Sequence, residues 1–180
     1  MAIPERKRLT VNELMMTIEQ DKKLYEIIDG EITMQAAPSV KHQRLVGRLY
    51  STIGDFIKAN KGKCEPFFTP TDVVIDDYNC VQPDVFVVCD PSKVNDERIN
   101  GAPDLVIEEV SSNRSDDYVR KLVLYKDSGV REYWIIDPKY ERTLVYDFAN
   151  DNYPQIYSFS QPVSAGIWNN ELSITISQLL

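Results

Sequence analysis

The stretch GAPDLVIEEVSSNRSDDYVRKLVLYKDSGVREYWIIDP, residues 101–138, decides the fold. Its first part, DLVIEEV, is apolar on both faces, which is typical of a strand buried between two layers. Ser115, Asp116 and Asp117 can cap a following helix, and Gly129 can end it after about three to four turns. A second strand, REYWIID, follows and stops at a proline. The order strand, helix, strand predicts a right-handed βαβ unit with parallel strands.

Two helices and a hairpin are predicted in the N-terminal third of the chain. The run TVNE at 10–13 is a capping box, and it opens a helix that fades by Asp21. The dipeptide Asp-Gly at 29–30 lies between two short apolar runs and predicts a type I′ hairpin, because both residues tolerate positive φ. Apolar residues at helical spacing over 39–62 predict a longer helix that ends at a glycine.

Strand-like runs fill most of the remaining sequence. The runs TDVVID at 71–76 and PDVFVV at 83–88 predict another hairpin, because 76–79 are turn residues. Three short runs near the C-terminus, TLVYDF, PQIYSF and LSITIS, also predict strands. We therefore expect an α/β fold of mixed α+β character: a central mixed sheet flanked by helices, with an extra N-terminal hairpin and extra C-terminal strands.

The length and charge of the chain limit its class. Its 180 residues suit one domain, residues 1–180, which can bury a core without disulfide or metal staples. A net charge of −8 argues against strong non-specific nucleic-acid binding, since phosphates would be repelled. The stretch 39–63 nevertheless carries six basic residues and His42 against one acid, and 72–104 is acid-rich. These stretches would suit a polyanion beside a divalent cation, although solvated faces of ordinary elements give the same pattern.

The cysteines and the ends of the chain indicate a compartment. Cys64, Cys80 and Cys89 are odd in number and contain no Cys-x-x-Cys pair, so they imply neither a disulfide framework nor a zinc cluster. The N-terminus has no apolar leader segment, and no run approaches about 18 apolar residues. We therefore expect a reduced, cytoplasmic protein that makes no membrane contact.

Two adjacent acids in DLVIEEV are the first candidates for chemistry. Successive strand residues point to opposite faces, so either Glu108 or Glu109 must enter an apolar layer. A buried carboxylate without a partner costs several kcal/mol or takes up a proton, and it therefore usually has a metal ion or a basic side chain beside it. The alternative is an exposed edge strand with an ordinary salt bridge.

Other candidates depend on how the strands are arranged. Asp84, after a proline, is a common type of turn residue, but it would converge with Glu108 if their strands are neighbours. Together they would form the oxygen shell that Mg²⁺ or Mn²⁺ prefers. Lys121 and Lys126 both border the apolar face of the following helix, and periodicity leaves the choice between them open. His42 is the single histidine, and it cannot form a zinc site with such distant cysteines.

These motifs, in their order and spacing, resemble the Uma2 family of stand-alone PD-(D/E)XK endonucleases, which is abundant in bacteria. The resemblance covers about residues 25–147 and is carried by YEIIDGEI, SVKHQRL, QPDVFVV, GAPDLVIEEVSS, K-x-x-x-Y and GVREYWIIDP. It implies a restriction-endonuclease-like core with a site for Mg²⁺ or Mn²⁺. The family's PD falls on Pro83 and Asp84, its second acid on Glu108, and its lysine on Lys121 of the following helix. The resemblance thus implies Asp84, Glu108 and Lys121 as catalytic residues, with both acids holding the metal.

One segment departs from the family's pattern. After Glu108 the usual E-V-L-S-P-S-T becomes EEVSSNR, so that Glu109 replaces an apolar residue and Ser112 stands where a proline is common. Glu109 is therefore a possible competitor for the metal. The departure leaves Asp84 and Lys121 in register with the pattern.

Two functions follow as hypotheses. The first is a metal-dependent endonuclease that hydrolyses DNA, in which His42, Arg44 and Arg48 contact backbone phosphates. The second is a binding or assembly module, acting as a homodimer, that keeps the nuclease fold without turnover. The net negative charge of the chain favours the second hypothesis. A nuclease fold does not by itself establish nuclease activity.

Overall fold

A six-stranded sheet forms the centre of the computed structural model, which describes residues 8–17, 24–110, 115–150 and 153–180. The strand order is β11-β10-β9-β8-β6-β3. The bounds are β3 Glu65–Phe68, β6 Val85–Val88, β8 Leu105–Glu109, β9 Glu132–Asp137, β10 Arg142–Asp147 and β11 Gln155–Ser158. Only β8 and β9 are parallel among the described pairs of this sheet.

The predicted βαβ unit is confirmed. Helix α3 (Ser115–Ser128) connects β8 to its parallel neighbour β9, and Gly129 ends the helix with a φ of +91°. Every residue of β9 except Asp137 is buried, as expected for a strand inside a parallel pair. The predicted cap at Ser115, Asp116 and Asp117 concerns side chains that lie outside the described part of the chain.

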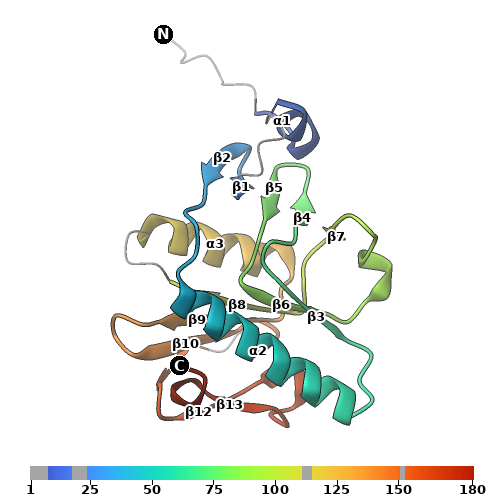
Figure 1. The fold of residues 1–180 in the computed structure, drawn as a ribbon. Coiled ribbons are helices and arrows are strands. Elements are labelled where there is room, and N and C mark those ends of the chain that lie inside the picture. The colour runs from blue at the N-terminus through green and yellow to red at the C-terminus, as the bar shows by residue number, and fades with distance from the viewer. Residues whose placement is uncertain (1–7, 18–23, 111–114, 151–152) are drawn as a thin grey trace.

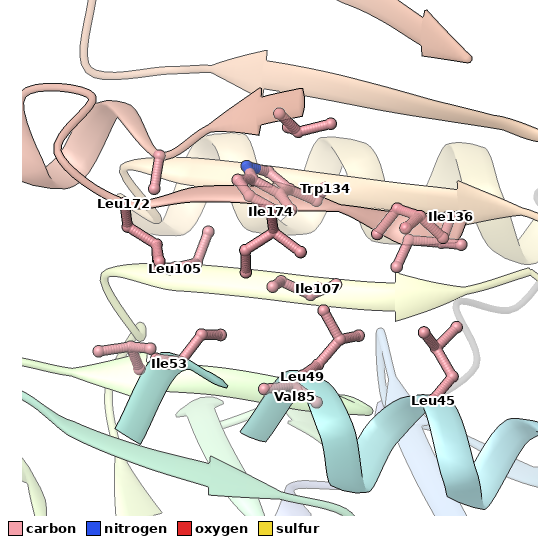
Figure 2. Close-up of a cluster of buried hydrophobic side chains, with 14 of the residues drawn as sticks. Leu45, Leu49, Ile53, Val85, Leu105, Ile107, Trp134, Ile136, Leu172 and Ile174 are labelled. Carbon is pink, nitrogen blue, oxygen red and sulfur yellow. The ribbon is translucent and has the colours of Figure 1, made fainter. Parts of the chain in front are cut away.

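The two faces of this sheet are covered differently (Figure 1). Helix α2 (Val40–Ala59) crosses one face, and the C-terminal hairpin of β12 (Pro162–Ser164) and β13 (Ser173–Thr175) packs beside it. Figure 2 shows Leu45, Leu49 and Ile53 of α2 directed at the sheet residues Val85 and Ile107. The opposite face packs against α3 and the second sheet.

The second sheet has five strands in the order β2-β1-β5-β4-β7. The bounds are β1 Tyr25–Ile28, β2 Glu31–Met34, β4 Val73–Asp76, β5 Asn79–Val81 and β7 Ile99–Asn100. The hairpin predicted at 29–30 is confirmed, with φ of +57° at Asp29 and +73° at Gly30. The hairpin predicted between 71–76 and 83–88 is wrong in its second strand, because the turn pairs β4 with β5 and β6 joins the central sheet.

Short helices complete the structure. Helix α1 (Val11–Thr17) begins at the predicted capping box, in which the Thr10 hydroxyl accepts from the Glu13 N–H and the Glu13 carboxylate accepts from the Thr10 N–H. Its predicted end at Asp21 lies outside the described residues. Three 3₁₀ helices cover Pro91–Lys93, Gly166–Trp168 and Ile176–Gln178. None of the described helices is both long and apolar enough to cross a bilayer.

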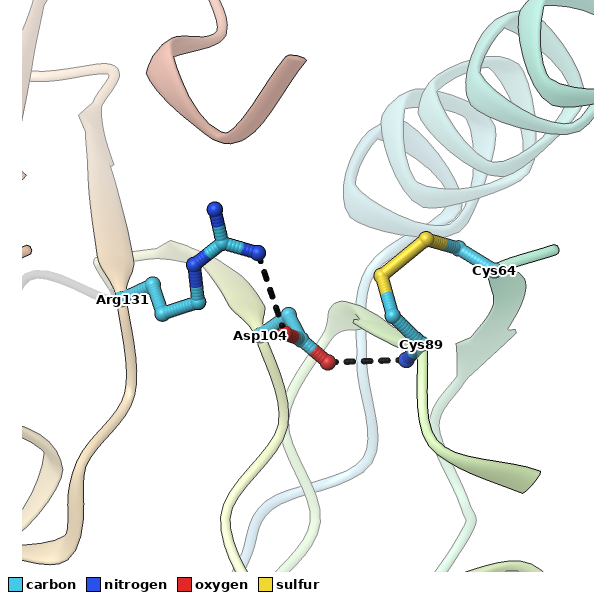
Figure 3. Close-up of a disulfide and its surroundings, with 4 residues drawn as sticks. All are labelled: Cys64, Cys89, Asp104 and Arg131. Carbon is cyan, nitrogen blue, oxygen red and sulfur yellow. Dashed lines mark hydrogen bonds and ion pairs between the residues drawn. A yellow bond between two sulfur atoms is a disulfide. The ribbon is translucent and has the colours of Figure 1, made fainter. Parts of the chain in front are cut away.

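Two of the three cysteines form a disulfide, contrary to the prediction from the sequence (Figure 3). Glu65 of β3 pairs with Val88 of β6, so the next pair outward is Cys64 and Cys89, and these two are bonded. The pair could not be found from spacing, because antiparallel registry joins residues 25 apart in sequence. Cys80 remains a free, buried thiol. The expectation of three reduced cysteines is therefore wrong.

Candidate active site

Two acids meet because β6 and β8 run antiparallel. Val85 lies opposite Ile107, which places Asp84 and Glu108 as the next pair outward. The Asp84 carboxylate also accepts from the Glu109 N–H at 2.8 Å and pairs with His42 Nε2 at 2.9 Å. The convergence of Asp84 and Glu108, which the sequence left dependent on strand order, is therefore present.

Glu108 is the member of the adjacent pair that enters the apolar layer on the α3 side. Leu105 and Ile107 belong to the core under α2, whereas Val106 belongs to the core under α3. Glu108 shares the face of Val106, and its carboxylate meets side chains of α3. Glu109 lies on the opposite face, and its Oε2 is buried with no hydrogen-bond partner in the described part of the chain.

Lys121 is the lysine that α3 turns inward. Its side chain is buried, with Nζ 2.9 Å from Glu108 Oε2 and 2.9 Å from Glu26 Oε1. Lys126 is exposed. The Tyr125 hydroxyl, one helical turn after Lys121, donates to Glu108 Oε1 at 2.6 Å. The structure thus distinguishes the two lysines that periodicity could not.

Glu26 is a site residue that the sequence reasoning missed. It lies on β1, in the second sheet, and its residue surface is fully buried. Its Oε1 accepts from both Lys121 Nζ and the Gln82 N–H, the latter at 3.0 Å. The available signal was the same as for Glu108: an acid flanked by apolar residues in a short strand. One face of a hairpin strand is normally exposed to solvent, so an acid there is usually a surface residue. The pattern around Glu26 was therefore weak evidence for a buried acid.

Burial controls the protonation of this cluster. Desolvation raises the pKa of Glu108 to about 7, and Lys121 opposes that rise by stabilising the carboxylate. Burial likewise raises the pKa of Tyr125 and of Glu109. The hydrogen bond to Asp84 raises the pKa of His42, although burial acts in the opposite direction. A cluster of perturbed groups at one place is typical of a functional site.

The cluster forms the floor of a cavity of about 880 Å³. Asp84, Glu108 and Lys121 all line it. One wall is the segment 35–39 before α2 together with His42, and the other is the connection between β9 and β10 at 137–142. A cavity of this size admits part of an extended polymer or a small ligand.

Arg44 and Arg48 lie elsewhere. Among the described residues that line the cavity, neither arginine is present. Arg44 is exposed, and Arg48 donates to the carbonyls of Leu179 and Leu180 at 2.9 and 2.7 Å. The structure therefore brings His42 to the acids but separates it from the two arginines with which it was grouped.

The acids fit a divalent cation with few protein ligands. No group of three or more histidine, cysteine or acidic side chains in the described residues could hold a metal. Asp84 and Glu108, however, are carboxylates on neighbouring strands that both face the cavity. Mg²⁺ usually keeps several waters and binds through one or two carboxylates plus substrate phosphates, so two acids suffice.

The fold and this cluster together define a restriction-endonuclease-like protein. Its β8-α3-β9 unit carries an acid at the end of one strand and a lysine on the following helix, opposite a second acid at the start of β6.

The chain belongs to the Uma2 family, whose model is described as "Putative restriction endonuclease" and matches residues 11–167. A crystal structure titled as a putative nuclease belonging to DUF820 from Anabaena variabilis is similar in fold, with a TM-score of 0.77 and 22% identity. The similarity covers 95% of this chain and 97% of the other. No curated protein matches the chain.

Proposed function

We propose that this protein is a Mg²⁺- or Mn²⁺-dependent endonuclease that hydrolyses phosphodiester bonds of DNA. The observation that carries the proposal is the buried Lys121 ammonium, held beside Glu108 at the floor of an open cavity that Asp84 also lines. Burying these charges is costly, and well-packed apolar residues of similar volume often serve folding as well or better. A charged cluster under a cavity is instead useful for binding and cleaving an anion.

Asp84 and Glu108 would hold the ion, which when bound supplies positive charge that polarises the scissile phosphate. Lys121 would stabilise the negative charge that develops on the phosphoryl group. Glu26 has a positioning role: its Oε1 accepts from Lys121 Nζ, which also donates to Glu108, so the ammonium is held between two carboxylates. His42 fixes the orientation of Asp84 through its Nε2.

Phosphate contacts along α2 are part of the proposal. Lys41 and Arg44 are exposed near the start of that helix, whereas Arg48 is occupied by the C-terminal carbonyls. The double variant K41E/R44E should weaken DNA binding and flatten its dependence on salt, because fewer counterions are released. R48E serves as the comparison. An unchanged salt slope in K41E/R44E would remove α2 from the DNA-binding surface.

The second candidate is a binding or assembly module without turnover, acting as a homodimer. The observation that favours it is that the charged side chains of the site are already paired with one another. Both oxygens of Asp84 have partners, and Lys121 contacts two carboxylates. A site closed in this way would release those contacts only if an ion or a phosphate replaced them.

Nicking of supercoiled plasmid and cleavage of single-stranded DNA, both with Mn²⁺, separate the two candidates. The endonuclease predicts metal-dependent nicking by wild type that disappears in Glu108→Ala. Titration calorimetry with Mn²⁺ should also show weaker binding in Asp84→Ala. Wild type that cuts no faster than Glu108→Ala would reject the endonuclease and leave the module.

A cytoplasmic location in a bacterium is also proposed, on the family's distribution. The Cys64–Cys89 disulfide counts against it, since such bonds are rare in the cytoplasm. Fractionation of cells checks it: the protein should be recovered in the cytoplasmic fraction.

A further inference from the structure

The connection between β9 and β10 forms a wall of the cavity and carries an exposed aromatic ring. Tyr140 lies at its tip and is 61% exposed, yet it lines the same cavity as Asp84 and Glu108. The hydrophobic clusters of the described core do not include it. Its ring therefore contributes little to folding and is available to a ligand in the cavity.

The turn that carries Tyr140 is held in one shape. The Asp137 carboxylate accepts from the backbone N–H of Lys139 at 3.1 Å and of Tyr140 at 3.3 Å. Its other oxygen lies 3.5 Å from Arg142 Nε. One side chain thus ties together both sides of the turn. A preorganised turn loses little conformational entropy when a ligand binds.

Two cations lie against the tyrosine ring. The Arg142 guanidinium is 4.8 Å and the Lys139 ammonium 5.2 Å from the ring centroid. The floor of the cavity is acidic, so these cations are the positive charges that a phosphate chain meets at this wall. Lys139 is exposed, and it can move to a phosphate and leave the ring face to a planar ligand.

We propose that Tyr140, backed by Arg142, is a stacking platform for one unpaired base of a DNA strand, with Lys139 on an adjacent phosphate. The inference rests on the proposed function, since the stacked base would belong to the strand cut over Glu108. Aromatic rings bind the faces of bases, and flanking cations hold the backbone of a single strand. Bases inside a duplex already stack on each other and present no free face. The preferred substrate class is therefore single-stranded or locally unpaired DNA.

Fluorescence anisotropy tests the platform with three labelled DNA ligands of equal length: a single strand, the same strand with abasic sites, and a blunt hairpin duplex. Titrations are run with Ca²⁺, and gels check that the DNA stays uncut. Wild type should bind the single strand most tightly. Tyr140→Ala should weaken that binding by about tenfold or more, while Tyr140→Phe stays within about twofold, because the ring is what binds.

Tyr153→Ala is the matched control, since Tyr153 is 94% exposed and lies outside the residues that line the cavity. It should leave all three affinities unchanged. The abasic strand and the hairpin should bind Tyr140→Ala as they bind wild type. The platform is rejected if Tyr140→Ala leaves single-strand binding within twofold, if it weakens all three ligands equally, or if wild type binds none of them.

Mn²⁺-dependent cleavage is measured separately, so that the two proposals can fail independently. Tyr140-dependent binding of the single strand without cleavage would reject the endonuclease and keep the platform. Cleavage that requires Glu108 but is unchanged in Tyr140→Ala would keep the endonuclease and reject the platform.

Discussion

The two ends of the parallel strands β8 and β9 each hold a carboxylate with little exposure to solvent, and the two carboxylates have different surroundings. Glu108, at the carboxyl end of β8, meets a lysine, a tyrosine and a cavity. Glu132, at the amino end of β9, accepts from Trp134 Nε1 at 2.6 Å and from the Ile167 N–H at 2.8 Å. Burial alone therefore does not identify a site.

The difference lies in what satisfies each carboxylate. Two neutral N–H donors use both oxygens of Glu132, and the one from Ile167 attaches the C-terminal segment to the sheet. Glu132 is absent from the described lining of the cavity. Glu108 instead shares one cation with Glu26, and a phosphate or a metal ion can change that arrangement. A buried acid is a candidate for chemistry when its partner is charged and a ligand can reach it.

The largest effect is expected from removing the charge shared at the carboxyl end. Lys121→Met leaves the buried Glu26 and the partly buried Glu108 without their cation and should lower the free energy of unfolding by about 3–5 kcal/mol. Urea denaturation measures it, and Lys126→Met, on the exposed side of α3, should change stability by less than about 0.5 kcal/mol.

A double variant sharpens that result. Glu26→Gln combined with Lys121→Met removes one of the two stranded carboxylates and should recover part of the lost stability without restoring cleavage. If the double variant is as unstable as Lys121→Met alone, the loss arises from packing and the two carboxylates are not coupled through the lysine.

At the amino end of β8 and β9, the Cys64–Cys89 disulfide should contribute to the stability of the fold. Cys64 and Cys89 lie at that end, where Asp104 accepts from the Cys89 N–H at 2.8 Å and contacts Arg131 (Figure 3). Closing a 25-residue loop stabilises a fold by about 3 kcal/mol. Cys64→Ser/Cys89→Ser should lose about this amount in urea denaturation and become insensitive to reductant. A variant that reductant still destabilises would show that another bond is responsible.

Substitutions of Glu108 and Glu132 should have different effects on DNA cleavage. Under the proposed function, Glu108→Gln should reduce Mn²⁺-dependent cleavage by at least about a hundredfold, because it would remove one of the two carboxylates that hold the metal ion. Glu132→Gln should leave the rate per folded molecule within about twofold while lowering the melting temperature, since one N–H donor loses its acceptor. Equal losses of activity would mean that the two ends are coupled.

The smallest effect concerns pH. Burial raises the pKa of Glu132 above its ordinary value. The Glu132 carboxyl group therefore binds its proton more tightly in the folded state than in the unfolded state. The stability that this protonation contributes is lost as the pH rises from about 4.3 through the raised pKa. The stability difference between wild type and Glu132→Gln should shrink over that interval. A difference that grows with pH would contradict the raised pKa.

Local patterns were sufficient for much of the fold. The capping box at Thr10, the Asp29-Gly30 turn and the βαβ unit were predicted because each depends on residues close together in the chain. The single domain over 1–180 and the homodimer stay predictions, as do the catalytic roles of Asp84, Glu108 and Lys121.

Contacts between distant segments required the three-dimensional structure. Glu26 and Lys121 are 95 residues apart, and Cys64 and Cys89 meet only because β3 and β6 are antiparallel neighbours. The choice between Lys121 and Lys126 also required distant contacts, since both lysines border one helix face and only Lys121 meets Glu26 and Glu108. Spacing along a chain specifies which side of a strand or helix a residue occupies. Which partner it meets there depends on the packing of elements that the sequence separates.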